Sequence, residues 1–382
     1  MKFLHIADLH IGKTLNQKTL IEDQKYILDQ IINQMIEHDI QNLILAGDIY
    51  DKQIPSKEAV SLFNDFLCEL ILKHEFKVYI ISGNHDSVER LNFASSILKK
   101  KGLYIETYAN SPIAKYVIND EFGDVNIYML PYSTPLYTRY KFDTTCKTYS
   151  DMIKYYVENS NINYEERNIL VSHHTLLNKE QAIFSDSEIR FNIGGTEGID
   201  AEYLKGFDYV ALGHLHTPQS VGYDHIRYSG SILKYSESEI FVNKCSVMVE
   251  LNEKGNVKIT ELPLKPLRNV TILKGKIDEL LTNPSEINEN FVYVVLTDET
   301  IVPYAMKRIR VKYPNAISLT YDNLLKNIEN KVIVKSIEFD YKNYEEQFSE
   351  FFNNVTESNL NENQINILES IVKKAVNENE TN

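Results

Sequence analysis

The chain has 382 residues, of which 43% are hydrophobic and 25% charged, proportions typical of a folded protein large enough for more than one domain. Its net charge of −14 argues against a protein that coats nucleic acid electrostatically, although bound cations and a local basic face can offset that sign. No apolar stretch is long enough to span a membrane, no secretion signal is evident, and the 3 cysteines fit neither a disulfide framework nor a cysteine-rich zinc site. We therefore expect a cytoplasmic protein without membrane association.

Short apolar runs recur along residues 2–216 and predict buried strands, because each is rich in Ile, Val and Leu and closes on polar or glycine residues. The runs are KFLHIADLH, NLILAGD, KVYIISGNHD, VNIYMLP, NILVSHH and YVALGHLH. Two apolar stripes at helical spacing lie between the early runs: Leu28, Ile31, Ile32 and Met35, then Val60, Phe63, Leu67, Leu70 and Ile71. This alternation of strands and helices predicts an α/β layered fold.

A second, smaller α/β module is predicted from about residue 268 to about residue 340, where strand and helix patterns alternate again. Before it, Lys254-Gly255-Asn256 is typical of a turn between two strands, and Pro263 and Pro266 mark a linker. A run of basic residues, in general more often a solvated face than a binding site, lies within the module: Lys307, Arg308, Arg310 and Lys312.

The chain beyond about residue 342 predicts two short amphipathic helices. Asn361 and Gln364 resemble a capping box at the start of the second helix. Helices of this kind bury their apolar faces either on their own domain or on a partner protein, and the sequence leaves both open. The two faces comprise Phe348, Phe351, Phe352 and Val355, and Leu368, Ile371, Val372 and Ala375.

The stretch ADLHIGKT at residues 7–14 ends in Gly12-Lys13-Thr14, which could be the tail of a phosphate-binding loop. Such a loop needs a further glycine where this chain has Ala7, and Asp8 would place a negative charge beside the phosphates. We therefore favour the alternative, in which Asp8 and His10 belong to a metal site.

Five of the six predicted strands end in side chains that bind metal ions. Because the carboxyl ends of strands in an α/β sheet line one crevice, residues far apart in the sequence can converge there. Asp-x-His and His-x-His in extended backbone would direct alternate side chains at one ion, and the glycines before Asp48, Asn84 and His214 would permit sharp turns. The candidates are Asp8, His10, Asp48, Asn84, His85, His173, His174, His214 and His216.

This set is too large for one four-coordinate ion and predicts two ions that share a carboxylate. Its mixture of carboxylate, imidazole and amide groups suits Mn²⁺, Fe²⁺ or Zn²⁺ better than Ca²⁺. His5 lies one residue out of phase with Asp8 and His10, so we expect it to be structural.

Read together, DLH, GDIYD, GNHDS, SHH and GHLH resemble the calcineurin-like metallophosphoesterase superfamily. Within it, FLHIADLHIGKTL, GDIYDKQIPS and SGNHDSVERL are similar to the SbcD-type nuclease subunits of bacterial DNA double-strand-break repair. The resemblance continues through MKRIRVKYPNAISL and FFNNVTESNL, and so covers essentially the whole chain. A departure is Leu9, which stands where the family usually has Trp.

The resemblance implies two divalent ions, with a preference for Mn²⁺, and a catalytic role for His85, which would stabilise or protonate the leaving oxygen. It implies His173 rather than the adjacent His174 as the ligand of the third motif. One ion would be held by Asp8, His10, Asp48 and His216, and the other by Asp48, Asn84, His173 and His214.

For architecture, the resemblance implies a four-layered nuclease domain over residues 1–265 and a capping domain that contacts DNA over residues 266–341. C-terminal helices over residues 342–382 would bind a coiled-coil ATPase of the SbcC type, with a homodimer of this chain inside a heterotetramer. The DNA contacts would include Lys307, Arg308, Arg310 and Lys312.

The expected function is that of a Mn²⁺-dependent DNA nuclease, a 3′–5′ double-strand exonuclease and single-strand endonuclease that uses two-metal in-line hydrolysis. A small-substrate phosphodiesterase is the alternative, and it would leave residues 268–382 without a purpose. A non-enzymatic scaffold is a third hypothesis, against which stands the presence of every expected ligand and of His85.

Overall fold

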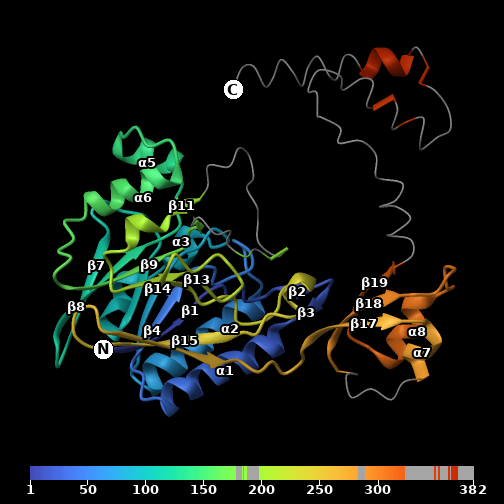
Figure 1. Cartoon of the computed structure of the whole chain (residues 1–382), viewed down its shortest axis with the longest axis horizontal. Coiled ribbons are helices and arrows are strands. Elements are labelled where there is room, and N and C mark those ends of the chain that lie inside the picture. Colours follow the sequence, from blue (N-terminus) through green and yellow to red (C-terminus); the bar gives the residue numbers. More distant parts are fainter. Residues whose placement is uncertain are drawn as a thin grey trace. The chain divides into compact units, whose positions relative to one another are not determined.

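The computed structural model describes residues 1–177, 183, 185–186, 198–282, 289–322, 348–349, 352, 360–361 and 363–368. It comprises two compact units, Met1–Tyr321 and Asp322–Asn382 (Figure 1). The first unit contains a large layered body, called here the sandwich (residues 1–265), and a small module (residues 266–321). The predicted boundaries at residues 265/266 and 341/342 stay a prediction.

Two six-stranded sheets form the centre of the sandwich. The first has the order β16-β15-β1-β4-β5-β6, with β1, β4, β5 and β6 parallel, and the second has the order β13-β14-β12-β9-β8-β7, with β14, β12, β9 and β8 parallel. The first comprises β16 (Val257–Pro263), β15 (Cys245–Leu251), β1 (Lys2–Ile6), β4 (Asn42–Ala46), β5 (Lys77–Ile81) and β6 (Leu103–Glu106). The second comprises β13 (Gln219–Val221), β14 (Tyr223–Tyr228), β12 (Tyr209–Leu212), β9 (Arg167–Ser172), β8 (Gly123–Leu130) and β7 (Ala114–Asp120).

The alternation of side chains along each strand divides the core into layers. Along β4, Leu43 and Leu45 pack with the helices α1 (Ile21–Glu37) and α2 (Lys57–Cys68), whereas Ile44 and Ala46 pack with residues of the second sheet such as Val171. The opposite face of the second sheet packs against α6 (Tyr149–Glu158). Helix, sheet, sheet and helix are the four layers, and the predicted α/β layered fold is confirmed (Figure 1).

The helices follow the apolar stripes closely. The longest, α1 (Ile21–Glu37), buries the predicted Leu28, Ile31, Ile32 and Met35, whereas in α2 (Lys57–Cys68) the predicted Val60 is 46% exposed and Ala59 and Leu62 are buried instead. The remaining helical segments of the sandwich are η1 (Glu69–Lys73), α3 (Val88–Leu91), α4 (Ser95–Leu98), η2 (Lys99–Lys101), α5 (Pro135–Phe142), α6 (Tyr149–Glu158), η3 (Ala201–Leu204) and η4 (Glu237–Glu239). Two short ribbons are β2 (Thr14–Leu15) with β3 (Lys18–Thr19), and β10 (Leu176–Leu177) with β11 (Ile199–Asp200).

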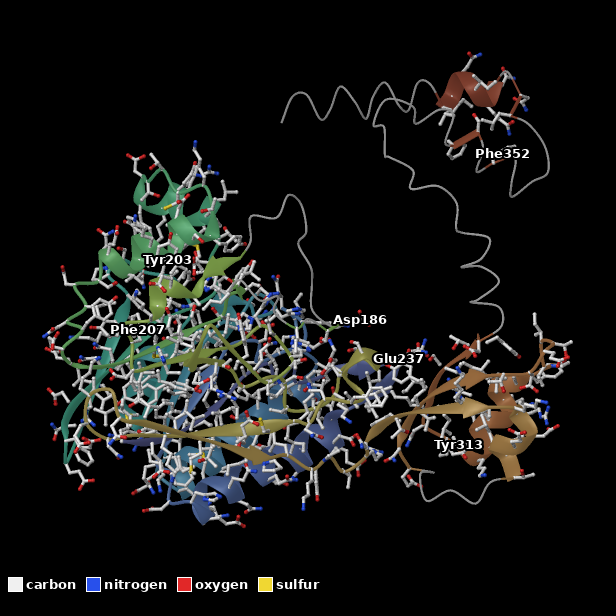
Figure 2. All side chains as sticks on the ribbon, in the orientation of Figure 1. Asp186, Tyr203, Phe207, Glu237, Tyr313 and Phe352 are labelled. Atoms are coloured by element: carbon white, nitrogen blue, oxygen red, sulfur yellow. The ribbon has the colours of Figure 1, made fainter. Side chains whose placement is uncertain are left out.

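The small module is a three-stranded parallel sheet, β17-β18-β19, with two helices and an apolar core of its own. Its elements are β17 (Val270–Gly275), α7 (Ile277–Thr282), β18 (Phe291–Leu296), α8 (Ala305–Lys312) and β19 (Ala316–Tyr321), as the strand and helix pattern predicted. Tyr313 is buried in it, where its hydroxyl donates to the Leu280 carbonyl at 3.2 Å (Figure 2). The linker prediction was wrong at Pro263, which ends β16 as the register partner of Cys245.

In the second unit, the predicted capping box is confirmed: the Asn361 amide donates to Gln364 Oε1 at 2.9 Å, and the Gln364 amide donates to Asn361 Oδ1 at 3.0 Å. Other predictions lie outside the described residues, namely the strand over residues 331–339 and the apolar positions Phe351, Val355, Ile371, Val372 and Ala375. Among the helices of the described residues, none combines the length and apolar character that crossing a bilayer requires.

Candidate metal centre

The predicted metal-binding residues converge at the carboxyl ends of strands from both sheets. Asp8 and His10 follow β1, Asp48 follows β4, and Asn84 and His85 follow β5. The second sheet supplies His173 after β9, and His214 and His216 after β12. Because the two sheets lie face to face, their adjacent strand ends bring together side chains more than 200 positions apart, such as His10 and His216, whose ring nitrogens are 3.1 Å apart.

The backbone reaches this arrangement by a different route from the extended spacing expected. The strand β1 ends at Ile6, and Asp8 (φ 53°), His10 (φ 43°) and Asp48 (φ 51°) are left-handed, as is His214 (φ 100°). Non-glycine residues rarely adopt this conformation, and where it occurs the surrounding structure must hold it. Here Asp8 N donates to the Gly47 carbonyl at 3.1 Å and His10 N to the Asp48 carbonyl at 3.0 Å.

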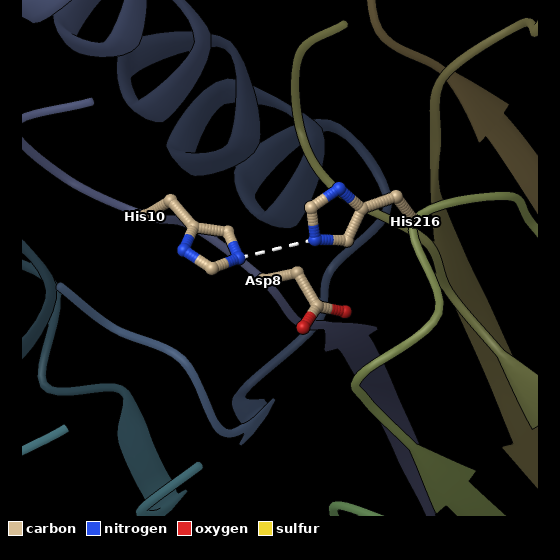
Figure 3. Close-up of side chains that lie close together, drawn as sticks. All are labelled: Asp8, His10 and His216. Carbon is tan, nitrogen blue, oxygen red and sulfur yellow. Dashed lines mark hydrogen bonds between the residues drawn. The ribbon is translucent and has the colours of Figure 1, made fainter. Parts of the chain in front are cut away.

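One group of close side chains comprises Asp8, His10 and His216, all buried (Figure 3). The Nε2 atoms of His10 and His216 face each other at 3.1 Å. Two imidazole nitrogens and a carboxylate oxygen within 4.8 Å of one another are a donor set that fits a divalent transition metal.

A second group surrounds His173. Its Nε2 lies 3.3 Å from Asp48 Oδ2, 3.2 Å from Asn84 Oδ1 and 4.0 Å from Asp8 Oδ1. The same Asn84 oxygen is 3.0 Å from Nδ1 of His214. The two groups together are called the cluster here. Asn84 and His214 are half-buried, while His173 is fully buried, so the cluster reaches solvent on the side of the Asn84 amide.

Asp48 lies between the two groups. Its Oδ2 is 3.6 Å from His10 Nε2 and 3.3 Å from His173 Nε2, and its Oδ1 accepts the His85 amide at 2.8 Å. This carboxylate is therefore the one placed to be shared by two ions, and Asp8 also has an oxygen near each group. The donors present fit a pair of divalent cations.

Burial and neighbouring charges set the protonation state of each group in the cluster. Burial opposes ionisation of Asp48, but His173 beside it holds the pKa of that carboxyl below its usual range. Burial lowers the pKa of His214 to about 3, which leaves a neutral imidazole with a lone pair. For His173 the carboxylate of Asp48 outweighs burial and raises the pKa to about 9, so in the metal-free cluster this ring carries the compensating charge.

Groups outside the cluster fix the orientation of its rings. Nδ1 of His173 donates to the Ala46 carbonyl at 2.7 Å, which leaves Nε2 facing Asp48. Nδ1 of His216 lies 3.5 Å from the buried Glu239, whose charge is balanced by Lys244 at 2.6 Å. Glu239 was not identified from the sequence, since neither a motif nor a strand end marks it.

Asp86 was also missed, although it stands within the motif GNHD. Its buried carboxylate accepts the backbone amides of Ile49, Tyr50 and Gly83 at 2.9–3.1 Å, and so joins the loops that carry Asp48 and Asn84. Burial and the nearby Asp48 charge raise the pKa of Asp86 to about 6.

The three glycines before the cluster residues serve two purposes. Gly47 adopts φ +91°, as a sharp turn requires. Gly83 and Gly213 do not have a positive φ, so the turn argument was wrong for them, and close approach is the reason instead. A Cβ on Gly83 would lie 2.1 Å from Asp48 Oδ1, and one on Gly213 would lie 2.0 Å from the Ala46 carbonyl oxygen.

The adjacent histidines of the third motif face different ways. His173 belongs to the cluster, whereas Nδ1 of His174 pairs with the Ser172 hydroxyl at 2.9 Å and its Nε2 lies 3.1 Å from the Ser133 amide. His174 also stacks on Tyr132, with ring centroids 5.5 Å apart. His5 is buried as well and contacts the Tyr209 hydroxyl at 3.0 Å, away from the cluster.

The basic run of the small module lies on α8. Lys307, Arg308 and Arg310 are exposed, and Arg308 pairs with the exposed Asp278 at 2.7 Å. Lys312 is half-buried, and its ammonium donates to the Leu280 carbonyl at 2.9 Å, so it anchors the end of α7.

A family model described as calcineurin-like phosphoesterase matches residues 1–218, more than half of the chain and every residue of the metal cluster. The chain belongs to the calcineurin-like phosphoesterase family. It is therefore a metal-dependent phosphoesterase, and its Asp/His groups are those that could bind the divalent ions this family uses. A second model, described as the type 5 capsule protein repressor C-terminal domain of SbcD proteins, matches residues 263–356. The two matches in this order support an SbcD-type nuclease subunit with an SbcC-type partner.

Solved structures similar to this phosphoesterase include two enzymes of low sequence identity. A dimetal phosphatase from Danio rerio is 12% identical, with 69% of this chain and 99% of that chain covered and a TM-score of 0.38. Phosphopantetheinyl hydrolase from Mycobacterium tuberculosis is 16% identical, with 60% and 88% covered and a TM-score of 0.33. The family assignment rests on the sequence models, since these scores are low.

Proposed function

We propose that this phosphoesterase is the Mn²⁺-dependent DNA nuclease subunit of an SbcCD-type complex in the cytoplasm. It would act as a 3′–5′ double-strand exonuclease and a single-strand endonuclease on broken or hairpin ends, as a homodimer with a coiled-coil ATPase. The observation that carries the proposal is the combination in one chain of a buried two-group Asp/His cluster and an SbcD-type C-terminal region.

Within the cluster we assign one ion to Asp8, His10, Asp48 and His216, and the other to Asp48, Asn84, His173 and His214. The distances around Asp48 support it as the shared ligand. Divalent ions bound there would neutralise the phosphodiester and activate water for in-line attack. The close approach of the Gly83 backbone to Asp48 and of the Gly213 backbone to His173 supports this assignment, since a side chain at either glycine would push these ligands apart.

His85 is assigned a catalytic role beside the cluster. Its amide is fixed on Asp48 Oδ1 at 2.8 Å, and its Nδ1 must donate to the Asp51 carbonyl at 3.1 Å because a carbonyl can only accept. The remaining nitrogen, Nε2, is the one available to a phosphate on the half-exposed side. In its protonated form it would donate to the leaving oxygen of the scissile bond.

The exposed cations of α8 are proposed to hold the DNA backbone. Lys307 and Arg310 would contact phosphates without reading sequence, together with Arg308 once it leaves Asp278. Lys312 belongs to the same predicted set, but its bond to the Leu280 carbonyl supports a weaker contribution. A local basic face of this kind is what a chain with a net charge of −14 needs to approach DNA.

The test is degradation of end-labelled linear duplex DNA by the purified chain with Mn²⁺ or Mg²⁺, with His85→Ala in parallel and His38→Ala as a matched histidine control. We expect cleavage with Mn²⁺, a loss of about 10²–10⁴-fold in His85→Ala with its metal content retained, and no loss in His38→Ala. Hydrolysis of bis(p-nitrophenyl) phosphate without cleavage of DNA, even after addition of the ATPase, would instead establish the small-substrate phosphodiesterase.

A further inference from the structure

Lys13, the central residue of the Gly12-Lys13-Thr14 stretch, has no place in the proposed chemistry so far, yet it lies beside the metal cluster. Its ammonium pairs with Asp51 Oδ1 at 2.8 Å, and both side chains are shielded, with exposed fractions of 16% and 14%. The same ammonium lies 5.6 Å from the ring centroid of Tyr235. An ion pair shielded in this way has more defined geometry than one on the open surface.

Asp51 connects this ion pair to the catalytic histidine. Its carbonyl accepts Nδ1 of His85 at 3.1 Å, and its carboxylate lies 3.8 Å from Nδ1 of His10. The Asp51 amide donates to the Ile11 carbonyl at 3.2 Å. One residue therefore contacts Lys13 with its side chain and His85 with its backbone, within a segment that lies against the first metal-binding loop.

The local fold holds Lys13 at this point. Its amide donates to the His10 carbonyl at 3.0 Å, and its own carbonyl accepts the Leu20 amide at 3.3 Å, across the short β2–β3 ribbon. Gly12 has φ +92°, and a Cβ there would lie 3.0 Å from Ala59 Cβ, so glycine suits the turn that directs Lys13 inward.

We propose that Lys13 is a positioning residue for His85 and acts through Asp51. The ammonium fixes the Asp51 side chain, which in turn steadies the peptide whose carbonyl orients the imidazole. Without the cation, the Asp51 carboxylate would turn towards Nδ1 of His10, and the carbonyl would no longer hold His85 in one orientation. This inference rests on the proposed catalytic role of His85. It adds the residue that fixes the orientation of the His85 ring.

The experiment compares Lys13→Met and Lys13→Arg in the wild-type and His85→Ala backgrounds, with end-labelled duplex DNA as the probe and Mn²⁺ supplied. Lys25→Met is the matched control, because the pair of Lys25 with Asp29 is exposed to solvent. We expect Lys13→Met to lower kcat about 10–100-fold with KM and metal content unchanged, Lys13→Arg to recover most of the rate, and Lys25→Met to behave as wild type.

Two outcomes separate this inference from the proposed function. If Lys13 acts through His85, Lys13→Met causes no further loss in the His85→Ala background, whereas an equal loss in both backgrounds overturns the inference. A crystal structure of Lys13→Met provides a readout independent of activity: we expect the His85 ring to leave the Asp51 carbonyl, and an unmoved ring would refute the positioning role. Full activity of His85→Ala itself would instead contradict the proposed function.

Discussion

The metal cluster and the basic face of α8 are both rich in charge, but the chain builds them in opposite ways. In the cluster, Asp48 and His173 are buried and each is oriented by fixed neighbours, such as the Ala46 carbonyl. On α8, Lys307 and Arg310 are exposed on one short helix. A preorganised site loses metal binding and catalysis when one ligand atom moves. An exposed charged face loses affinity for DNA gradually, one phosphate contact at a time. The two regions should therefore respond differently to substitution and to salt.

Removal of the shared carboxylate should have the largest effect. We expect Asp48→Asn to reduce phosphodiester hydrolysis to the background rate and to lower the occupancy of both ions, because its oxygens lie near His10 and His173. Metal analysis after dialysis and the hydrolysis of bis(p-nitrophenyl) phosphate measure the two effects. Retention of two tightly bound ions would contradict the assignment of Asp48 as the bridge.

A single methyl group should also damage the cluster. Gly83→Ala would place a Cβ 2.1 Å from Asp48 Oδ1, so we expect metal affinity to fall about 10–100-fold. Gly275→Ala in the small module is the matched control, since its Cβ would meet flexible side chains, Leu280 at 3.3 Å and Glu279 at 3.7 Å. Equal metal affinity in the two variants, measured by titration with Mn²⁺, would show that close packing at Gly83 does not matter.

Substitutions on α8 should produce a graded, salt-dependent loss. We expect Lys307→Ala and Arg310→Ala each to lower the slope of log K against log salt for duplex DNA by about 0.9, with hydrolysis of bis(p-nitrophenyl) phosphate unchanged. Fluorescence anisotropy at several salt concentrations measures the slope, and Lys276→Ala on the same module is a suitable control. Unchanged slopes in both variants would remove α8 from the DNA interface.

The smallest effect concerns pH and distinguishes the sandwich from the small module, whose residues 266–321 contain no histidine. Burial lowers the pKa of His5 and of His174 to about 3, below the ordinary histidine value of 6.5. At a pH between these two pKa values, both histidines are protonated in the unfolded chain but neutral in the folded chain. The free energy of unfolding therefore falls as the pH drops below about 6.5.

Between pH 6.5 and pH 3, each of these two histidines lowers the free energy of unfolding by up to about 1.4 kcal/mol for every unit that the pH falls. Urea unfolding of the metal-free protein at pH 7 and pH 5 measures the loss, and His174→Gln should reduce it. An equal loss in wild type and His174→Gln would show that His174 is not buried as a neutral ring.

Much of the fold and of the cluster membership could be predicted because the relevant signals are local. Alternating strand and helix patterns indicate the sandwich and the small module. The motifs at the strand ends identify the residues of the cluster, of which Asp8 is the first and His216 the last in the sequence. The backbone at those residues could not be predicted, because left-handed Asp8 and His10 depend on hydrogen bonds that their amides donate to the Gly47 and Asp48 carbonyls in another loop.

Supporting residues were harder to find for the same reason. Glu239 reaches His216 from a segment with no motif, and Lys13 belongs to a pattern that suggests only a phosphate loop, which Ala7 excludes. Val60 shows the limit of periodicity, since α2 turns it to solvent and buries Leu62. Such contacts are set by tertiary packing, which a single sequence does not encode in any short pattern.

The most direct test of the two-ion cluster is the anomalous difference density of crystals grown with Mn²⁺. The account predicts two peaks per chain, one contacting His10 and His216 and the other contacting Asn84 and His173, with Asp48 touching both. A single peak, or two peaks that share no Asp48 oxygen, would contradict it.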